Sequence, residues 1–223
     1  MPPEIAAVVA ARNEEERLPG TLVALRSAFP AVRLIVADDA STDHTPEIAR
    51  EAGAELMRGE KRLGKGGAMT PAAGLALDPE PRAVLLCDGD LGESAAHLAR
   101  LVGAVESGEA DLAIARFARR VGGGFGIALT SSRQTVERRT GRRLEAPLSG
   151  QRALTPAALK AVLPFAPGFG METAMNIDAL RAGLTVAEIE LDLEHRATGR
   201  TAAGFAHRGR QLADIARVYL SRR

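Results

Sequence analysis

Two aspartates separated by a single glycine directly follow an apolar run, in the segment Leu85-Leu86-Cys87-Asp88-Gly89-Asp90. An apolar strand that ends in acidic residues holds them at the carboxyl edge of a sheet, where open α/β folds bind their ligands. Two carboxylates one residue apart can converge on one hard divalent cation and on the phosphates it carries. The segment therefore predicts a site for a divalent cation and a phosphorylated ligand. An ordinary Asp- and Gly-rich turn is the alternative that this motif alone leaves open.

A second glycine-rich segment, residues 59–66, comes within one residue of a phosphate-binding P-loop. Gly66 stands where that motif requires the Ser or Thr that holds magnesium, so a P-loop ATPase is not expected. What remains is a helix entrance bearing Lys65, which suits an anionic phosphate. No Gly-x-Gly-x-x-Gly follows the first apolar run, where residues 10–14 stand instead. That difference argues against a dinucleotide-binding site.

Three further side chains lie where an expected strand or helix meets a loop. Asp39 follows the second expected strand, and because neighbouring Ser, Thr and Asp side chains suffice to cap the next helix, it is available to a base or ribose. His195 ends a late strand, and an imidazole beside Asp90 would complete a mixed oxygen and nitrogen site that suits Mn²⁺ as well as Mg²⁺. Glu172 opens a helix, where the dipole favours a carboxylate. In a cleft, Glu172 would bind a sugar hydroxyl or take a proton.

These candidates need a sheet that brings them to one edge. The first half of the chain alternates short β-branched runs with helical segments, which is the pattern of an α/β fold with a largely parallel sheet. No internal repeat and no linker interrupts the pattern, so a single domain is expected. Strands are predicted at 5–10, 32–37, 54–57, 83–87, 110–115 and 184–193, and helices near 17–27, 45–53, 67–77, 94–106, 131–140, 171–182 and 205–220.

The composition is that of a soluble globular protein, with 46% hydrophobic and 26% charged residues in a chain of 223. The single cysteine, Cys87, cannot form an internal disulfide, which favours a reducing compartment. The start of the chain lacks the pattern of a signal peptide. No stretch reaches the ~18 uninterrupted apolar residues of a spanning helix. A cytoplasmic protein is therefore expected.

The net charge of +1 conceals an asymmetry, because residues 116–143 contain eight arginines and one acid, Glu137. A positive field of this size would attract a phosphorylated acceptor or an anionic membrane surface. The apolar neighbours Ile127, Leu129 and Val136 make a lipid phosphate a candidate acceptor. A solvated basic helix is the alternative. Peripheral contact with the inner face of the membrane is thus one expectation, and nucleic acid is not an expected partner.

Taken in order, these segments resemble family 2 glycosyltransferases of the GT-A fold. The matching segments of the first half are residues 8–15, 36–43, 64–68 and 88–90. In the second half, residues 147–154 and 164–172 look like glucosyl-3-phosphoglycerate synthases. The Gly-Lys-Gly sequence at 64–66 is also similar to that of polyprenyl-phosphate sugar transferases.

The resemblance implies one GT-A domain, an open and mostly parallel sheet flanked by helices, with a nucleotide-sugar half at 1–115 and an acceptor half at 116–223. It implies transfer from a nucleoside-diphosphate sugar, with UDP or GDP as nucleotide and Mg²⁺ or Mn²⁺ as cofactor, to a phosphorylated or polyprenyl-phosphate acceptor. The implied donor-binding residues are Ala11, Arg12, Glu14, Asp39, Lys65 and Asp88. Asp90 and His195 are the implied metal ligands, and Asp88, Asp90 and Glu172 the implied catalytic residues.

Several alternatives stay open. One is a glucosyl-3-phosphoglycerate synthase-like enzyme with a small soluble acceptor, although residues 122–127 lack the Arg and Thr that phosphoglycerate-using relatives carry in their acceptor loop. Others are a nucleotidyltransferase, which would place a glycine-rich signature after the first strand, and a catalytically silent binding protein. Glu172 would be the base of an inverting enzyme but would only hold the sugar in a retaining one. A monomer and a homodimer are equally compatible with the sequence.

Overall fold

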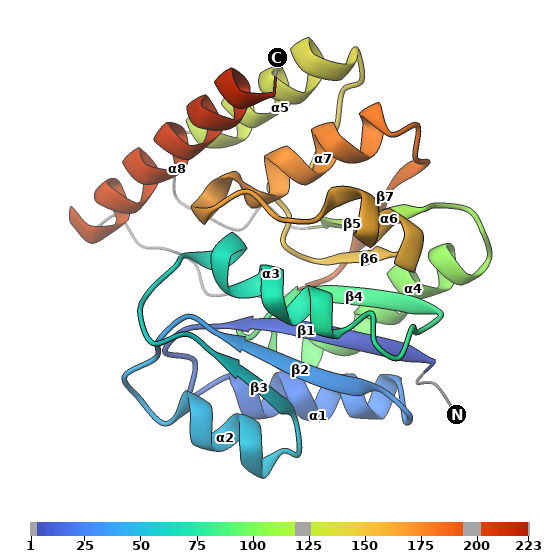
Figure 1. Cartoon of the computed structure of the whole chain (residues 1–223), viewed down its shortest axis with the longest axis vertical. Coiled ribbons are helices and arrows are strands. Elements are labelled where there is room, and N and C mark those ends of the chain that lie inside the picture. The colour runs from blue at the N-terminus through green and yellow to red at the C-terminus, as the bar shows by residue number, and fades with distance from the viewer. Residues whose placement is uncertain (1–3, 119–125, 194–201, 223) are drawn as a thin grey trace.

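The computed structural model describes residues 4–118, 126–193 and 202–222. In this part of the chain a seven-stranded sheet has the order β3-β2-β1-β4-β6-β5-β7 (Figure 1). Only β6 runs antiparallel to its neighbours, β4 and β5. The strands are β1 (Ile5–Ala11), β2 (Arg33–Asp38), β3 (Glu55–Arg58), β4 (Ala83–Asp88), β5 (Leu112–Phe117), β6 (Arg152–Leu154) and β7 (Val186–Leu191). The α/β class with a mostly parallel sheet is confirmed.

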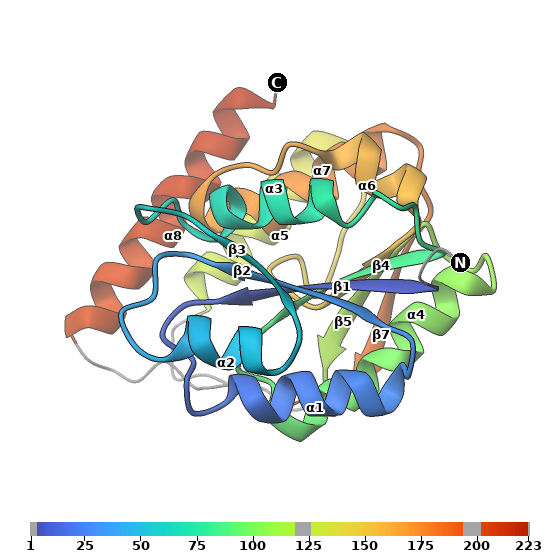
Figure 2. The ribbon, with the colours of Figure 1, turned by 60° about the horizontal axis from the view of Figure 1, so that its bottom comes forward.

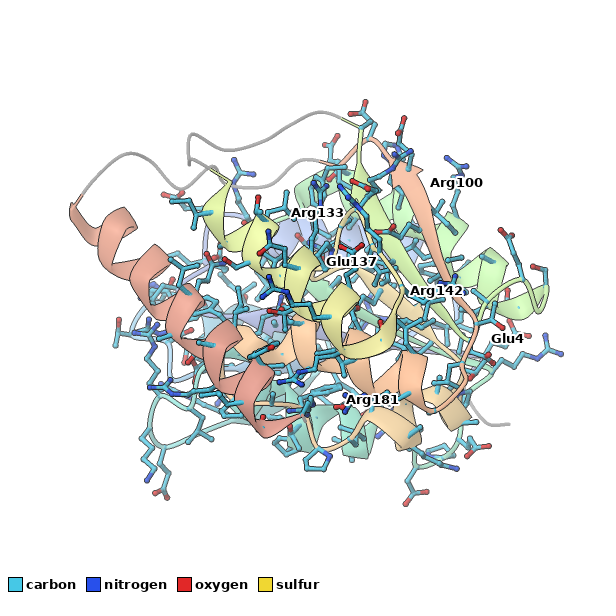
Figure 3. The ribbon with its side chains drawn as sticks, turned by 90° about the horizontal axis from the view of Figure 1, so that it is seen from above. Glu4, Arg100, Arg133, Glu137, Arg142 and Arg181 are labelled. Carbon is cyan, nitrogen blue, oxygen red and sulfur yellow. The ribbon has the colours of Figure 1, made fainter. Side chains whose placement is uncertain are left out.

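Helices cover both faces of the sheet (Figure 2). On one face lie α1 (Leu18–Ala28), α2 (Thr45–Glu51), the 3₁₀ helix η1 (Gly92–Leu98) and α4 (Ala99–Glu106). On the other lie α3 (Lys65–Leu75), α6 (Pro156–Val162), the 3₁₀ helix η2 (Gly168–Gly170) and α7 (Met171–Arg181). Outside α7, α5 (Ile127–Thr140) and α8 (Ala202–Ser221) lie side by side (Figures 1 and 3).

The central strand β1 shows why the strands read as continuous apolar runs. Ala7 and Val9 face the core formed with α1 and α4, whereas Ala6 and Val8 face the core formed with α3 and α7. All four are completely buried. A parallel strand covered on both faces gains nothing from polar residues at alternate positions, so it becomes uniformly hydrophobic.

Over residues 4–118 every predicted strand and helix is present, with bounds that differ by a few residues. The helix expected at 67–77 begins two residues earlier, at Lys65, and the one expected at 94–106 is divided into η1 and α4. Three elements of the second half were not predicted, namely β6, α6 and the 3₁₀ helix η2. β6 has only three residues and begins with a completely buried arginine, so no apolar run marks it.

The two halves of the sheet diverge from β1. The chain adds β2 and β3 on one side of β1 and then crosses to add β4 on the other. Such a reversal of strand order leaves a crevice at the carboxyl ends of the strands, where ligands bind in folds of this kind. Ala10 pairs with Asp88 of β4, and Ala11 pairs with Asp38 of β2, so the three strands end at the same level.

Candidate active site

A pocket of about 530 Å³ opens at the carboxyl ends of β1, β2 and β4. Its volume is in the range of small-molecule binding sites. All predicted site residues that the structure describes lie in its wall, namely Ala11, Arg12, Glu14, Asp39, Lys65, Asp88, Asp90 and Glu172. The ninth, His195, lies outside the described residues.

Lys65 joins two of the predicted carboxylates on the floor of the pocket. Its Nζ atom lies 2.5 Å from Asp88 Oδ1 and 2.9 Å from Glu172 Oε1. Only 19% of the Lys65 side chain and 8% of the Glu172 side chain are exposed, so these charges interact with little screening by water. Burial opposes the charge on Lys65, but the carboxylates of Asp88 and Glu172 outweigh it and raise the lysine pKa above its ordinary value. The cluster carries one positive and two negative charges.

Glycines bring Lys65 to this position. Gly64 precedes α3 with a φ of 76°, a backbone conformation that residues with a side chain rarely adopt. A Cβ atom at this position would press against the Cα atom of Gly168. A side chain at Gly66 would collide with the carbonyl oxygen of Ala166. The first turn of α3 is therefore pressed against residues 166–168, just before Glu172. The predicted helix entrance with a lysine is thus present, and its glycines serve close packing.

The Asp88-Gly89-Asp90 turn is fixed by hydrogen bonds to Thr21 of α1, a residue that is completely buried. Thr21 Oγ1 donates to Gly89 O at 2.9 Å and accepts from Gly92 N at 2.8 Å. Gly89 N also donates to Ala10 O of β1 at 2.8 Å. These contacts fix the main chain on both sides of Asp90, whose carboxylate lies in the pocket wall.

On the other side of β1, two loops are joined by hydrogen bonds. Asn13 N donates to Ser41 Oγ at 3.0 Å, and Thr42 N donates back to Asn13 Oδ1 at 2.9 Å. Asn13 and Ala40 both have positive φ, 56° and 57°, a strained conformation for alanine. Strain of this kind persists where the surrounding contacts over-determine a loop, often beside a ligand site.

Asp38, the last residue of β2, and the predicted Asp39 differ in their contacts. Asp38 is completely buried and accepts from Ser41 N at 3.1 Å, with Arg58 Nε 3.2 Å away, so it shapes the turn. Asp39 lies in the pocket wall, and its carboxylate accepts from Leu63 N at 2.6 Å and Gly64 N at 3.0 Å. Asp39 therefore ties the end of β2 to the entrance of α3.

The pocket wall also contains residues for which the sequence analysis assigned no role. On the side away from β2 these are Phe117, Leu148, Ser149, Gly150, Gln151, Phe169 and Gln211. Residues 148–151 belong to the segment 147–154, whose similarity to glucosyl-3-phosphoglycerate synthases could have indicated that they line the site. No sequence pattern indicated Phe117 or Gln211, because their positions depend on how β5 and α8 pack.

The donor set fits a hard divalent cation. Asp88 and Asp90 carry carboxylate oxygens on one turn of the pocket wall, the ligand type that such a cation prefers, and phosphate oxygens of a bound nucleotide would add more. Within residues 4–118, 126–193 and 202–222, no three His, Cys, Asp or Glu side chains group closely enough to hold a metal by themselves. This arrangement suits an ion that is shared between the protein and a phosphorylated ligand.

Comparison with known proteins agrees with this geometry. The sequence model of glycosyl transferase family 2 matches residues 6–161. An undecaprenyl-phosphate mannosyltransferase of Micrococcus luteus is 27% identical over 98% of this chain and 95% of its own length. Glucosyl-3-phosphoglycerate synthase of Mycobacterium tuberculosis with phosphoglyceric acid has 27% identity and a TM-score of 0.80, covering 98% of this chain and 79% of that one. Its complex with Mn²⁺, UDP-glucose and phosphoglyceric acid has 26% identity and a TM-score of 0.78, with the same coverage.

Proposed function

The chain belongs to glycosyl transferase family 2, and we propose that it transfers a sugar from a UDP-sugar to a phosphorylated acceptor with the help of a divalent cation. The enzyme class and the GT-A fold follow from the family and from the similar structures. The nucleotide, the cation and the acceptor are the proposed part. Support for UDP and for the cation comes from the similar synthase, whose complexes contain UDP-glucose with Mn²⁺ and UDP with Mg²⁺.

The observation that carries the proposal is the Lys65 cluster on the pocket floor. Transfer breaks the bond between the anomeric carbon and the diphosphate, so negative charge develops on the departing UDP. The ammonium group of Lys65, at the first turn of α3, is placed to stabilise that charge. A bound cation would supply Lewis-acid stabilisation of the same oxygens. Asp90 would hold it, with His195 as the second protein ligand.

The remaining predicted residues divide between nucleotide and sugar. Ala11, Arg12, Glu14 and Asp39 line the β1 and β2 side of the pocket and are proposed to bind the nucleoside. Asp88 and Glu172 flank Lys65, and we assign them to the ribose and the transferred sugar. Glu172 is 6% exposed, so a hydrogen bond from its carboxylate to a sugar hydroxyl would be well shielded from water.

We assign the acceptor to the second half of the chain, residues 116–223, and the residues that line the far wall support this assignment. Phe117, Phe169 and Gln211 stand there, whereas the basic lining residues Arg12, Arg62 and Lys65 stand on the donor side, within the part of the chain that the structure describes. An acceptor hydroxyl would attack the anomeric carbon while it passes its proton to a base, for which Glu172 is the candidate, whereas an acceptor phosphate would attack through an oxygen that is already ionised. In both cases the bond to UDP breaks and UDP departs with the electron pair. A phosphorylated acceptor is favoured by both relatives, one named for undecaprenyl phosphate and one bound to phosphoglyceric acid.

UDP-glucose with Mn²⁺ should raise the melting temperature of the protein, and the increase should depend on the metal. At a ligand concentration of roughly a hundred times Kd, about 2.7 kcal/mol of stabilisation corresponds to roughly 5 to 10 °C in a chain of this size. Thermal shift with UDP-, GDP- and ADP-sugars, each with and without Mn²⁺, measures it. Magnesium-ATP should give no comparable shift, because the glycine-rich segment ends in Gly66. Tight ATP binding with hydrolysis, and none of UDP-sugar, would contradict the proposal.

A lipid-linked acceptor predicts salt-sensitive binding to anionic vesicles. Figure 3 labels Arg133 on the outer helix α5, Arg142 just after it, and Arg181 in the last turn of α7, near α8. Part of this charge is neutralised, since Arg133 lies 2.8 Å from Glu145. No helix in the described ranges is long and apolar enough to cross a bilayer. Each arginine near an anionic surface contributes roughly 1 kcal/mol, so sedimentation with anionic vesicles should be strong at low salt and lost at high salt. Equal, negligible binding to anionic and neutral vesicles would leave a small phosphorylated acceptor.

A further inference from the structure

The side chain of Gln151 forms two hydrogen bonds with Asp88. Gln151 Nε2 donates to Asp88 Oδ2 at 2.9 Å, and Asp88 N donates to Gln151 Oε1 at 3.1 Å. Lys65 Nζ contacts the other carboxylate oxygen, Oδ1, at 2.5 Å. Each oxygen of the Asp88 carboxylate therefore has its own partner, which fixes the plane of the carboxylate. Gln151 is 2% exposed, so little water competes for these bonds.

The loop that carries Gln151 is itself held by a buried cation. Arg152 is completely buried, and its Nε donates to Ser149 O at 2.8 Å. Its Nη1 donates to Asn176 Oδ1 at 2.7 Å, and Asn176 Nδ2 donates to Pro147 O at 2.9 Å. Burial lowers the pKa of Arg152 to about 10, so it remains protonated at neutral pH. The main-chain carbonyls of Pro147 and Ser149 are thereby held by buried donors.

The rest of the loop is equally constrained. Glu188 of β7 accepts from Glu145 N at 2.8 Å and from Ala146 N at 2.5 Å. Gln151 O accepts from Ala115 N of β5 at 2.9 Å. A side chain at Gly150 would collide with Lys65 Nζ and Asp88 Oδ2, so the loop lies directly on the ion cluster. A loop fixed this firmly can determine the position of a group that it touches.

We propose that Gln151 is a positioning residue for the donor site, a role that presupposes the proposed function. Its amide keeps the Asp88 carboxylate in the orientation that the donor requires, and Arg152 keeps the amide in place. Without the amide, Lys65 alone would hold the Asp88 carboxylate, which could then rotate about its side-chain bonds away from the orientation that the donor requires. Gln151 acts through Asp88 and is not assigned a contact with the reacting atoms.

Gln151→Met tests this role, because methionine has nearly the same length but forms neither hydrogen bond. Donor KM and the calorimetric Kd for UDP-sugar with Mn²⁺ should both rise roughly tenfold to a hundredfold, the usual range for a lost hydrogen bond to a charged group. The acceptor KM should change less than threefold. A crystal structure of the variant should show the Asp88 carboxylate moved from its position between Gln151 and Lys65.

Two controls separate positioning from general stability. Gln134→Met makes the same change on the exposed surface of α5 and should leave donor affinity and melting temperature unaltered. Thr155→Ala removes the hydrogen bond that caps α6, at 3.1 Å, and should lower the melting temperature without changing donor Kd. If Gln151→Met does not fold, Gln151→Asn takes its place, because it stays polar but cannot reach both groups of Asp88.

Parent-like donor affinity in a folded Gln151→Met or Gln151→Asn would overturn the positioning role. So would equal weakening of donor and acceptor binding, or a donor loss that Thr155→Ala reproduces. If the parent binds no nucleoside-diphosphate sugar, the proposed function fails instead. The position of Asp88 in the crystal structures of parent and variant then still decides whether Gln151 holds it.

Discussion

Asp90→Ala should abolish metal-dependent binding of the donor and lower turnover by roughly a thousandfold, because a catalytic cation contributes several kcal/mol of stabilisation to the departing charge. Asp90 is the carboxylate that we assign to the cation, and it lies in the pocket wall on a turn whose main chain is fixed by Thr21. The fold itself should be little affected, since the side chain is partly exposed and lies outside both hydrophobic cores. Calorimetry with Mn²⁺ and UDP-sugar, alongside thermal melting, measures both effects.

Two companion variants sharpen the measurement on Asp90. Asp90→Asn keeps the size of the side chain but removes its charge, so it should lose nearly as much metal affinity as Asp90→Ala. Glu106→Ala removes an exposed acid at the end of α4, far from the pocket wall, and should behave as the parent. If Asp90→Ala binds Mn²⁺ and donor as the parent does, the metal site is elsewhere.

Lys65→Met should weaken UDP-sugar binding and also destabilise the protein by about 3 kcal/mol, the cost of removing one partner from a buried ion pair. In a chain of this size that corresponds to roughly 6 to 12 °C in Tm. The reason is that Asp88 and Glu172 would then face each other without the ammonium group that now lies between them. Methionine preserves most of the side-chain volume, so the loss reports the charge rather than a cavity.

The pH dependence should differ between the parent and Lys65→Met. The folded-state pKa of Lys65 is raised above about 10.5, so its stabilising contribution is complete below that value and is lost only as pH rises through the folded-state pKa. From pH 6 to 9 the parent should therefore show no change in stability due to this lysine. Lys65→Met should lack the loss of stability that the parent shows at high pH, because it has no ammonium group to deprotonate.

Lys160→Met is the matched control for Lys65→Met. Lys160 forms an ion pair with Glu80 in which both side chains are more than half exposed. Exposed pairs of this kind contribute little, so stability and donor affinity should stay at the parent values. Equal effects of the two lysine substitutions would mean that the pocket cluster has no special role.

The sequence indicated which residues line the β1, β2 and β4 side of the pocket, because that information is local. β1, β2 and β4 are buried on both faces, so each reads as an apolar run, and the residue after such a run lies at the sheet edge. Asp39, Lys65 and Asp90 could therefore be placed before the fold was known. Their chemical roles, and the part played by His195 outside the described residues, stay predictions.

The far side of the pocket depends on contacts between distant residues. Gln151 reaches Asp88 only because β6 inserts antiparallel beside β4, and three residues carry no detectable strand pattern. The ion pair between Lys65 and Glu172 likewise needs α3 to pack against residues 166–168. One local signal was present and unused: Thr155-Pro156, a capping residue followed by proline, marks the start of α6.

The place of β6 also determines how this enzyme can be recombined with its relatives. β6 belongs to the second half of the chain, yet it lies between β4 and β5 of the first half and brings Gln151 to Asp88. In a chimera that joins residues 1–115 of this chain to the second half of a relative, β6 would come from the relative. Asp88 would then lie beside the relative's loop instead of Gln151. A crossover after Leu154 would keep α5 and β6 with the first half of the chain, and would exchange α6, η2, α7, β7 and α8. Libraries that seek new acceptors should retain their donor chemistry only with the later junction.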